Sequence, residues 1–82
     1  MQTIIVYTKE NCPLCDEALA TLQLLRHDYS FAIDERDIYT NDDWLETYQL
    51  QIPVIDINGT TLNCEQISYE AVEAALQVAN SK

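Results

Sequence analysis

The chain has 82 residues and a formal net charge of −10, from 14 acidic and 4 basic side chains. A chain of this length hides only about 60–65% of its unfolded surface, which excludes a multidomain enzyme, a (β/α)8 barrel and a full dinucleotide-binding fold. The negative charge repels phosphate backbones and anionic lipids, so we expect neither a nucleic-acid nor a membrane partner. The charge is either a solvated surface that keeps the protein soluble or a surface that selects a basic partner.

The first half of the chain predicts a strand–helix–strand unit. Residues 3–7 are β-branched and aromatic, as in a strand that is buried on both faces. A helix follows from Cys12 and closes with Arg26 and His27, and its apolar positions recur at helical spacing. These positions are Leu14, Ala18, Leu22 and Leu25. Apolar and other residues then alternate from residue 29, which predicts a second strand over residues 29–38.

The second half predicts a short helix, a hairpin and a last helix. Thr40 or Asn41 caps a helix over residues 42–48, and acidic residues occupy its first turn. Asn58-Gly59 is a strong two-residue hairpin signal between strands over 54–57 and 60–63. The last helix begins at Ser68. The order of elements predicts one α/β domain over residues 1–82, with a four-stranded mixed sheet and helices on its faces.

Cys12 and Cys15 stand where the first strand passes into the first helix. No segment has the composition of a signal peptide or a membrane span, so we expect a cytoplasmic protein. In that compartment a close cysteine pair is more often catalytic or metal-binding than structural. The free N–H groups and the dipole at a helix start favour the thiolate of Cys12, and Cys15 lies within reach to resolve a mixed disulfide.

Three segments resemble the glutaredoxin family. The stretch from Tyr7 to Cys15 (Tyr-Thr-Lys-Glu-Asn-Cys-Pro-Leu-Cys) is similar to its active-site segment, residues 52–54 (Ile-Pro-Val) to its Val-Pro element, and residues 57–59 to its hairpin. Residues 12–18 resemble the Cys-x-Leu-Cys-Asp-Glu-Ala motif of short bacterial glutaredoxin-like proteins. The resemblance implies a thioredoxin-like fold with sheet order 2-1-3-4 and three helices, and thiol–disulfide exchange in cell redox homeostasis.

The same resemblance implies roles for individual residues. Cys12 corresponds to the nucleophile and Cys15 to the resolving thiol, and Lys9 corresponds to a basic residue that steadies the thiolate or the glutathione carboxylate. Pro53 corresponds to a cis-proline that faces the active site, and Ile52 would offer its backbone N–H and C=O to an extended substrate. The residues that we expect to border the substrate are therefore Lys9, Pro13, Leu14, Ile52, Pro53, Cys64 and Glu65.

Glutathione is implied as a co-substrate, although the chain departs from the family at the glutathione site. Leu14 stands where the family has Tyr. Residues 62–65 (Leu-Asn-Cys-Glu) replace a Gly-Gly turn and its acidic residue, which leaves Glu65 as the candidate acid. We expect a monomer without a resident cofactor, whose partner is a disulfide-bearing protein or a small thiol.

An alternative reading is a metal or iron–sulfur binding module, or an adaptor without reductase activity. A structural zinc site normally uses two cysteine pairs, and beyond Cys12 and Cys15 this chain offers only Cys64, His27 and carboxylates. We therefore expect no metal ligands in the site. Cys64 is either a core or bystander thiol or a third redox thiol. The acidic residues between 34 and 43 predict a solvated face, because a calcium loop would need a glycine.

Overall fold

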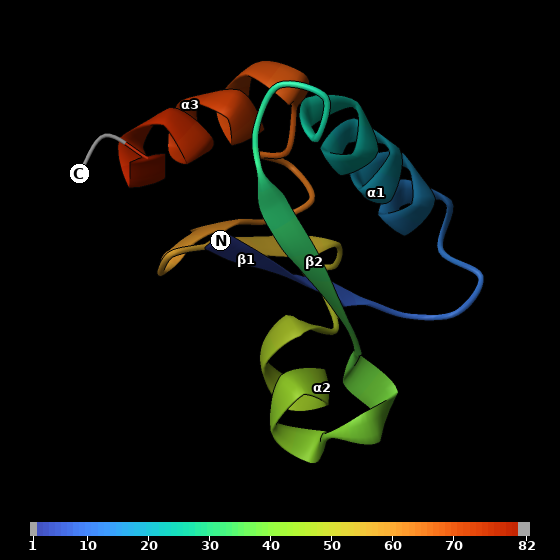
Figure 1. The fold of residues 1–82 in the computed structure, drawn as a ribbon. Helices are drawn as coiled ribbons and strands as arrows, with labels where there is room; N and C mark the ends of the chain where they lie inside the picture. Colours follow the sequence, from blue (N-terminus) through green and yellow to red (C-terminus); the bar gives the residue numbers. More distant parts are fainter. Residues whose placement is uncertain (1, 81–82) are drawn as a thin grey trace.

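The computed structural model describes residues 2–80 and contains one mixed sheet with helices on both faces (Figure 1). In chain order the elements are β1 (Gln2–Thr8), α1 (Pro13–Leu25), β2 (Phe31–Asp37), the 3-10 turn η1 (Ile38–Thr40), α2 (Asp42–Tyr48), β3 (Val54–Ile57), β4 (Thr60–Leu62) and α3 (Tyr69–Asn80). The strand order is β2-β1-β3-β4. The predicted sheet order and the three helices are confirmed.

The sheet combines one parallel pair with two antiparallel pairs. β1 runs parallel to β2 in a register that joins Gln2 to Phe31 at one end and Thr8 to Asp37 at the other. β3 pairs antiparallel with both β1 and β4. Because β1 and β2 are parallel, their carboxyl ends meet at one edge, and the loop from β1 to α1 leaves the sheet there.

Element boundaries differ from the prediction where a polar or turn interaction competes with the regular element. β2 begins at Phe31 and not at residue 29, because the N–H of Tyr29 donates to the carbonyl of Leu25 in the turn after α1. β4 ends at Leu62, because the N–H of Asn63 donates to the side chain of Gln66. Both exchanges replace a ladder hydrogen bond with a local one.

The Asn58-Gly59 turn and the N-cap of α2 form as predicted. Asn58 and Gly59 both have positive φ angles, 52° and 90°, and the N–H of Gly59 donates to Asp56 Oδ1 at 2.9 Å. Two successive left-handed residues are what a tight hairpin requires, which explains why the chain uses its only glycine here. Asn41 caps α2 through hydrogen bonds from the N–H groups of Asp43 and Trp44.

Each face of the sheet has its own core. α1 and α3 cover one face, and α2 lies on the other (Figure 1). The α1–α3 core consists of Ile4, Val6, Ala18, Leu22, Leu25, Phe31, Ile55, Ile57, Val72 and Leu76. On the α2 face Tyr7 stacks on Tyr48 with ring centroids 4.3 Å apart and meets the edge of Trp44 at 5.8 Å. Trp44 and Tyr48, which are four residues apart on α2, are thus packing residues of this face.

No helix within residues 2–80 is long and apolar enough to cross a membrane.

Candidate active site

Cys12 and Cys15 form a disulfide at the start of α1, with their Cα atoms 5.2 Å apart. Cys12 is the N-cap residue of α1, and its Sγ accepts a hydrogen bond from the N–H of Cys15 at 3.2 Å. Cys12 is 8% exposed and Cys15 only 2% exposed. The first sulfur is therefore the outer one, placed where a helix N-terminus stabilises negative charge.

The local sequence holds the disulfide in place. β1 ends at Thr8, and Asn11 turns the chain with a positive φ of 55°, a conformation that asparagine tolerates better than most residues. Pro13 then occupies the first position of α1, where its missing N–H is not needed. Ala18, Leu22 and Leu25 anchor α1 in the core, so the disulfide stands on a rigid element.

A small cleft of about 120 Å³ lies beside the first turns of α1, the helix that begins at the disulfide. Three of the expected substrate-binding residues, Leu14, Pro53 and Cys64, line it together. The full lining is Leu14, Glu17, Ala18, Thr21, Pro53, Cys64 and Ile67. The Ile52–Pro53 peptide bond is cis, as the resemblance implied. The N–H of Cys64 donates to the carbonyl of Gln51 at 3.0 Å, which ties the segment after β4 to the loop that carries Pro53. We call this hollow the proline cleft.

Cys64 is a half-buried free thiol that shares the proline cleft with Pro53. The two readings of Cys64, bystander or third redox thiol, stay predictions. Within residues 2–80 no three His, Cys, Asp or Glu side chains are grouped so that they would hold a metal ion.

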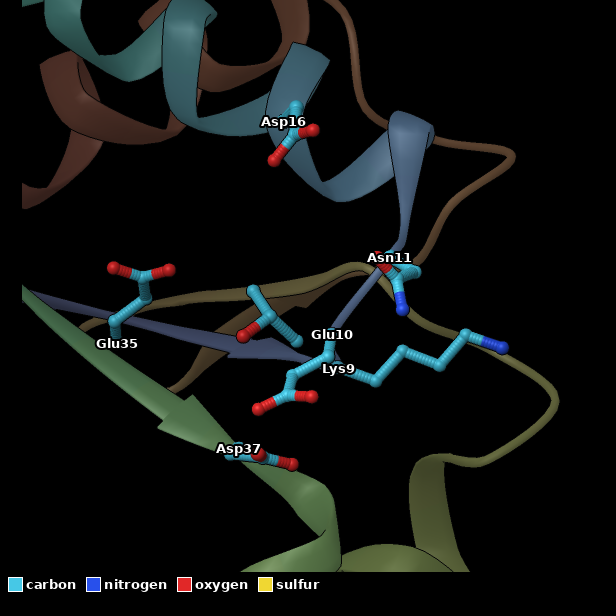
Figure 2. Close-up of a pocket in the computed structure, with 7 residues that line it drawn as sticks. Lys9, Glu10, Asn11, Asp16, Glu35 and Asp37 are labelled. Carbon is cyan, nitrogen blue, oxygen red and sulfur yellow. The ribbon is translucent and has the colours of Figure 1, made fainter.

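A second, larger hollow of about 420 Å³ lies on the other side of α1, and Lys9 lines it (Figure 2). Its other lining residues are Thr8, Glu10, Asn11, Asp16, Glu35 and Asp37. We call it the acidic groove. It forms where the carboxyl ends of β1 and β2 meet the first turn of α1, and Figure 2 shows the side chain of Lys9 directed away from the acidic side chains.

Three expected site residues lie elsewhere. Glu65 is exposed and lines neither hollow, and Pro13 is exposed at the first position of α1. Ile52 packs against the α2-face core, and its N–H donates to the carbonyl of Tyr48 at 3.0 Å. The expectation that this N–H is free for a substrate is therefore wrong, because the turn after α2 already uses it.

The acidic groove is the feature that sequence reasoning missed. Glu35 and Asp37 are two residues apart on β2, so their side chains point to the same face of the sheet. Thr8 pairs with Asp37 in the parallel register and follows Ile4 and Val6 on the face that α1 covers. The period of two residues along β2, which places Glu35 and Asp37 on the face that α1 covers, was the signal that could have separated these two acids from the rest of the acidic run.

A comparison with protein families identifies the family of the chain. The model of the family described as "Glutaredoxin-like domain (DUF836)" matches residues 3–77. The chain belongs to this glutaredoxin-like family. Its thioredoxin-like fold and its close Cys12–Cys15 pair are compatible with a role of the thiol–disulfide oxidoreductase type.

Solved structures show the same fold. The protein Ne2328 from Nitrosomonas europaea has a TM-score of 0.77 at 26% identity, covering 92% of this chain and 91% of that one. A thioredoxin variant from Halobacterium salinarum NRC-1 has a TM-score of 0.68 at 12% identity, with 95% and 74% covered. A variant of the thioredoxin-like protein BC3987 has a TM-score of 0.61 at 23% identity, with 89% and 97% covered.

Proposed function

We propose that this protein is a small cytoplasmic thiol–disulfide oxidoreductase in which Cys12 attacks and Cys15 resolves. The observation that carries the proposal is the disulfide between Cys12, the N-cap of α1, and Cys15 in the first turn of α1, within a glutaredoxin-like fold. In the reduced protein the same position places a Cys12 thiolate at the positive end of the helix dipole, with the N–H of Cys15 as a donor.

The reaction exchanges two electrons between two sulfur pairs. The Cys12 thiolate attacks one sulfur of a substrate disulfide, R–S–S–R′, so that a Cys12–S–S–R bond forms while the S–S bond of the substrate breaks and R′–S⁻ leaves and takes up a proton. Cys15, after losing its proton, then attacks Cys12 Sγ, and R–S⁻ leaves and is protonated. The dithiol of the protein is oxidised to the disulfide seen here, and the substrate is reduced to two thiols.

Return to the dithiol needs two electrons from an external thiol reductant. Two molecules of a monothiol such as glutathione, or one molecule of a protein dithiol, balance this step by the reverse exchange. We propose either as the co-substrate of a monomeric protein that needs no resident cofactor. The family resemblance supports glutathione, whereas Leu14 and residues 62–65 differ from the family's glutathione site.

The test is to trap the intermediate. Cys15→Ser combined with Cys64→Ser leaves Cys12 as the only thiol, so a stable mixed disulfide with a peptide disulfide should accumulate and be seen by intact mass. The matched control, Cys12→Ser combined with Cys64→Ser, keeps Cys15 alone and should form the adduct far more slowly, because Cys15 is almost fully buried. Equal adduct formation in both variants, or none in either, would overturn the assignment of Cys12 as nucleophile.

A further inference from the structure

The acidic groove concentrates like charge next to the reactive disulfide. Four carboxylates line it: Glu10 from the β1–α1 loop, Asp16 from α1, and Glu35 and Asp37 from β2. It borders the reactive sulfurs along the chain, because Asn11, which also lines it, precedes Cys12 and Asp16 follows Cys15. Figure 2 shows these acidic side chains around one hollow.

No cation of the protein neutralises this cluster within residues 2–80. In these residues, the ion pair that forms joins Arg36 to Asp34 at 2.9 Å, and neither residue lines the groove. Arg36 also lies over the ring of Trp44, which packs on the α2 face. Lys9 lines the groove but extends away from the carboxylates (Figure 2). Like charges that lie near one another without a counter-ion repel each other. A bound cation would reduce this repulsion, so the groove favours a cationic ligand.

The hydroxyl of Thr8 adds a polar anchor to the groove. Thr8 is only 7% exposed and lines the hollow, on the sheet face that carries Ile4 and Val6. Among residues 2–80 the structure shows no hydrogen bond of its hydroxyl, and every fully buried side-chain oxygen or nitrogen there has a partner, so the Thr8 oxygen is accessible and borders the hollow. A hydroxyl oxygen in this place can accept a hydrogen bond from a donor group bound in the groove.

We infer that the acidic groove binds a cationic side chain, arginine or lysine, of a polypeptide whose disulfide is exchanged at Cys12. This inference rests on the proposed function and names its substrate class. The guanidinium or ammonium group lies among Glu10, Asp16, Glu35 and Asp37 and donates to the hydroxyl of Thr8. The flanking backbone of the same polypeptide brings its disulfide to Cys12. Redox exchange then follows the two-step course given above, with the groove supplying affinity and orientation only.

The test compares peptide disulfides that differ at one position. Three peptides carry Arg, Gln or Glu two residues from the cysteine, and their reduction by the dithiol form of the protein is followed by chromatography. Each rate is divided by the rate with dithiothreitol alone, which removes differences in the intrinsic reactivity of the peptides. At about 10 mM salt, where the Debye length is roughly 30 Å, we expect the Arg peptide to be reduced about tenfold faster than the Gln peptide and the Glu peptide to be slowest.

The matched variants remove the same amount of charge from different places. Glu10→Gln with Glu35→Gln empties the groove of two charges, and Glu46→Gln with Glu70→Gln removes two from exposed positions of α2 and α3. We expect the groove variant to lose most of the Arg preference, measured as the ratio of the Arg-peptide rate to the Gln-peptide rate, and the distant variant to keep that ratio. Thr8→Val should lower the preference further without any change in net charge.

The outcomes separate this inference from the proposed function. Equal rates for the three peptides, or an equal loss of preference in both double variants, would overturn the groove as the recognition site, because net charge alone would then explain the effect. Failure to reduce any of the peptides would instead contradict the oxidoreductase itself. Loss of the Arg preference at about 1 M salt is expected, since the Debye length falls to roughly 3 Å.

Discussion

Two hollows beside the first turns of α1 differ in size and in charge. The acidic groove has a volume of about 420 Å³, and its carboxylates come from the β1–α1 loop, α1 and β2. The proline cleft is less than a third of that volume and brings Leu14, Pro53 and the free thiol of Cys64 together. An α-helix has about 3.6 residues per turn, so the side chains of neighbouring residues point in different directions. Asp16 therefore lines the acidic groove, and Glu17 lines the proline cleft.

Under the proposed function, this difference assigns substrate recognition to the acidic groove and the surroundings of the exchange reaction to the proline cleft. The proline cleft contains the proline of the cis peptide bond and Leu14, which stands between Cys12 and Cys15 in the sequence. The acidic groove contains no sulfur and carries charge instead. A change in the groove should therefore alter which substrate is preferred, and a change in the cleft should alter the rate for every substrate.

The largest expected effect is at the disulfide itself. Cys12→Ser should reduce the exchange rate to that of the uncatalysed reaction, because a hydroxyl does not replace the thiolate. Cys64→Ser, made in the proline cleft, should slow exchange by no more than about threefold, since Cys64 is outside the disulfide. The measurement is turnover of a peptide disulfide with dithiothreitol as reductant. Loss of turnover in Cys64→Ser would make Cys64 a redox partner and not a wall of the cleft.

A charge in the proline cleft should have the next largest effect. Leu14 is 55% exposed and lines the cleft, whereas Leu24 on the same helix is 59% exposed and lines neither hollow. Leu14→Glu should slow reduction of all three peptides by about three- to tenfold, because a substrate that covers this position must desolvate the carboxylate. Leu24→Glu is the control for the added charge. Equal slowing by both variants would remove the cleft from the substrate path.

A smaller effect should distinguish the two neighbouring acids of α1. Asp16→Asn should lower the ratio of Arg-peptide to Gln-peptide reduction by about two- to threefold, the scale of one partly exposed ion pair. Glu17→Gln, which removes the same charge from the cleft side, should leave that ratio in place. The two hollows would lose their distinction if both variants shifted the ratio alike.

The smallest effect is on stability and lies away from both hollows. Burial raises the pKa of Tyr48, which stacks on Tyr7 under the sheet. The neutral phenol therefore contributes stability that is fully present below the unfolded pKa of about 10 and is lost as the pH rises through the higher folded value. Urea unfolding at increasing pH should show this loss, and Tyr48→Phe should remove the part due to Tyr48. An unchanged slope in that variant would assign the loss to other groups.

The sequence predicted the elements that rest on local rules. The apolar spacing of α1, the β-branched run of β1 and the Asn58-Gly59 turn each have a single favoured structure, and all three form. The boundaries of β2 and β4 were less accurate, because hydrogen bonds of Tyr29 and Asn63 with nearby groups shorten these strands.

The local geometry at the cysteine pair and at Pro53 was predicted because it depends on consecutive residues. Cys12, Cys15 and the cis bond before Pro53 follow from segments that resemble the family. The engaged N–H of Ile52 depends on the carbonyl of Tyr48, which only the turn after α2 brings near. The acidic groove depends on the register of β1 with β2, and Glu35 and Asp37 therefore could not be separated from a solvated acidic run by composition.

The most direct measurement is a single turnover without external reductant. The reduced protein, freed of reducing agent, is mixed with a limiting amount of the Arg peptide disulfide, quenched in acid and analysed by mass after alkylation of free thiols. We predict one Cys12–Cys15 disulfide formed for each peptide disulfide reduced, with Cys64 alkylated in every molecule. A protein that keeps both Cys12 and Cys15 alkylated while the peptide remains oxidised would contradict the account.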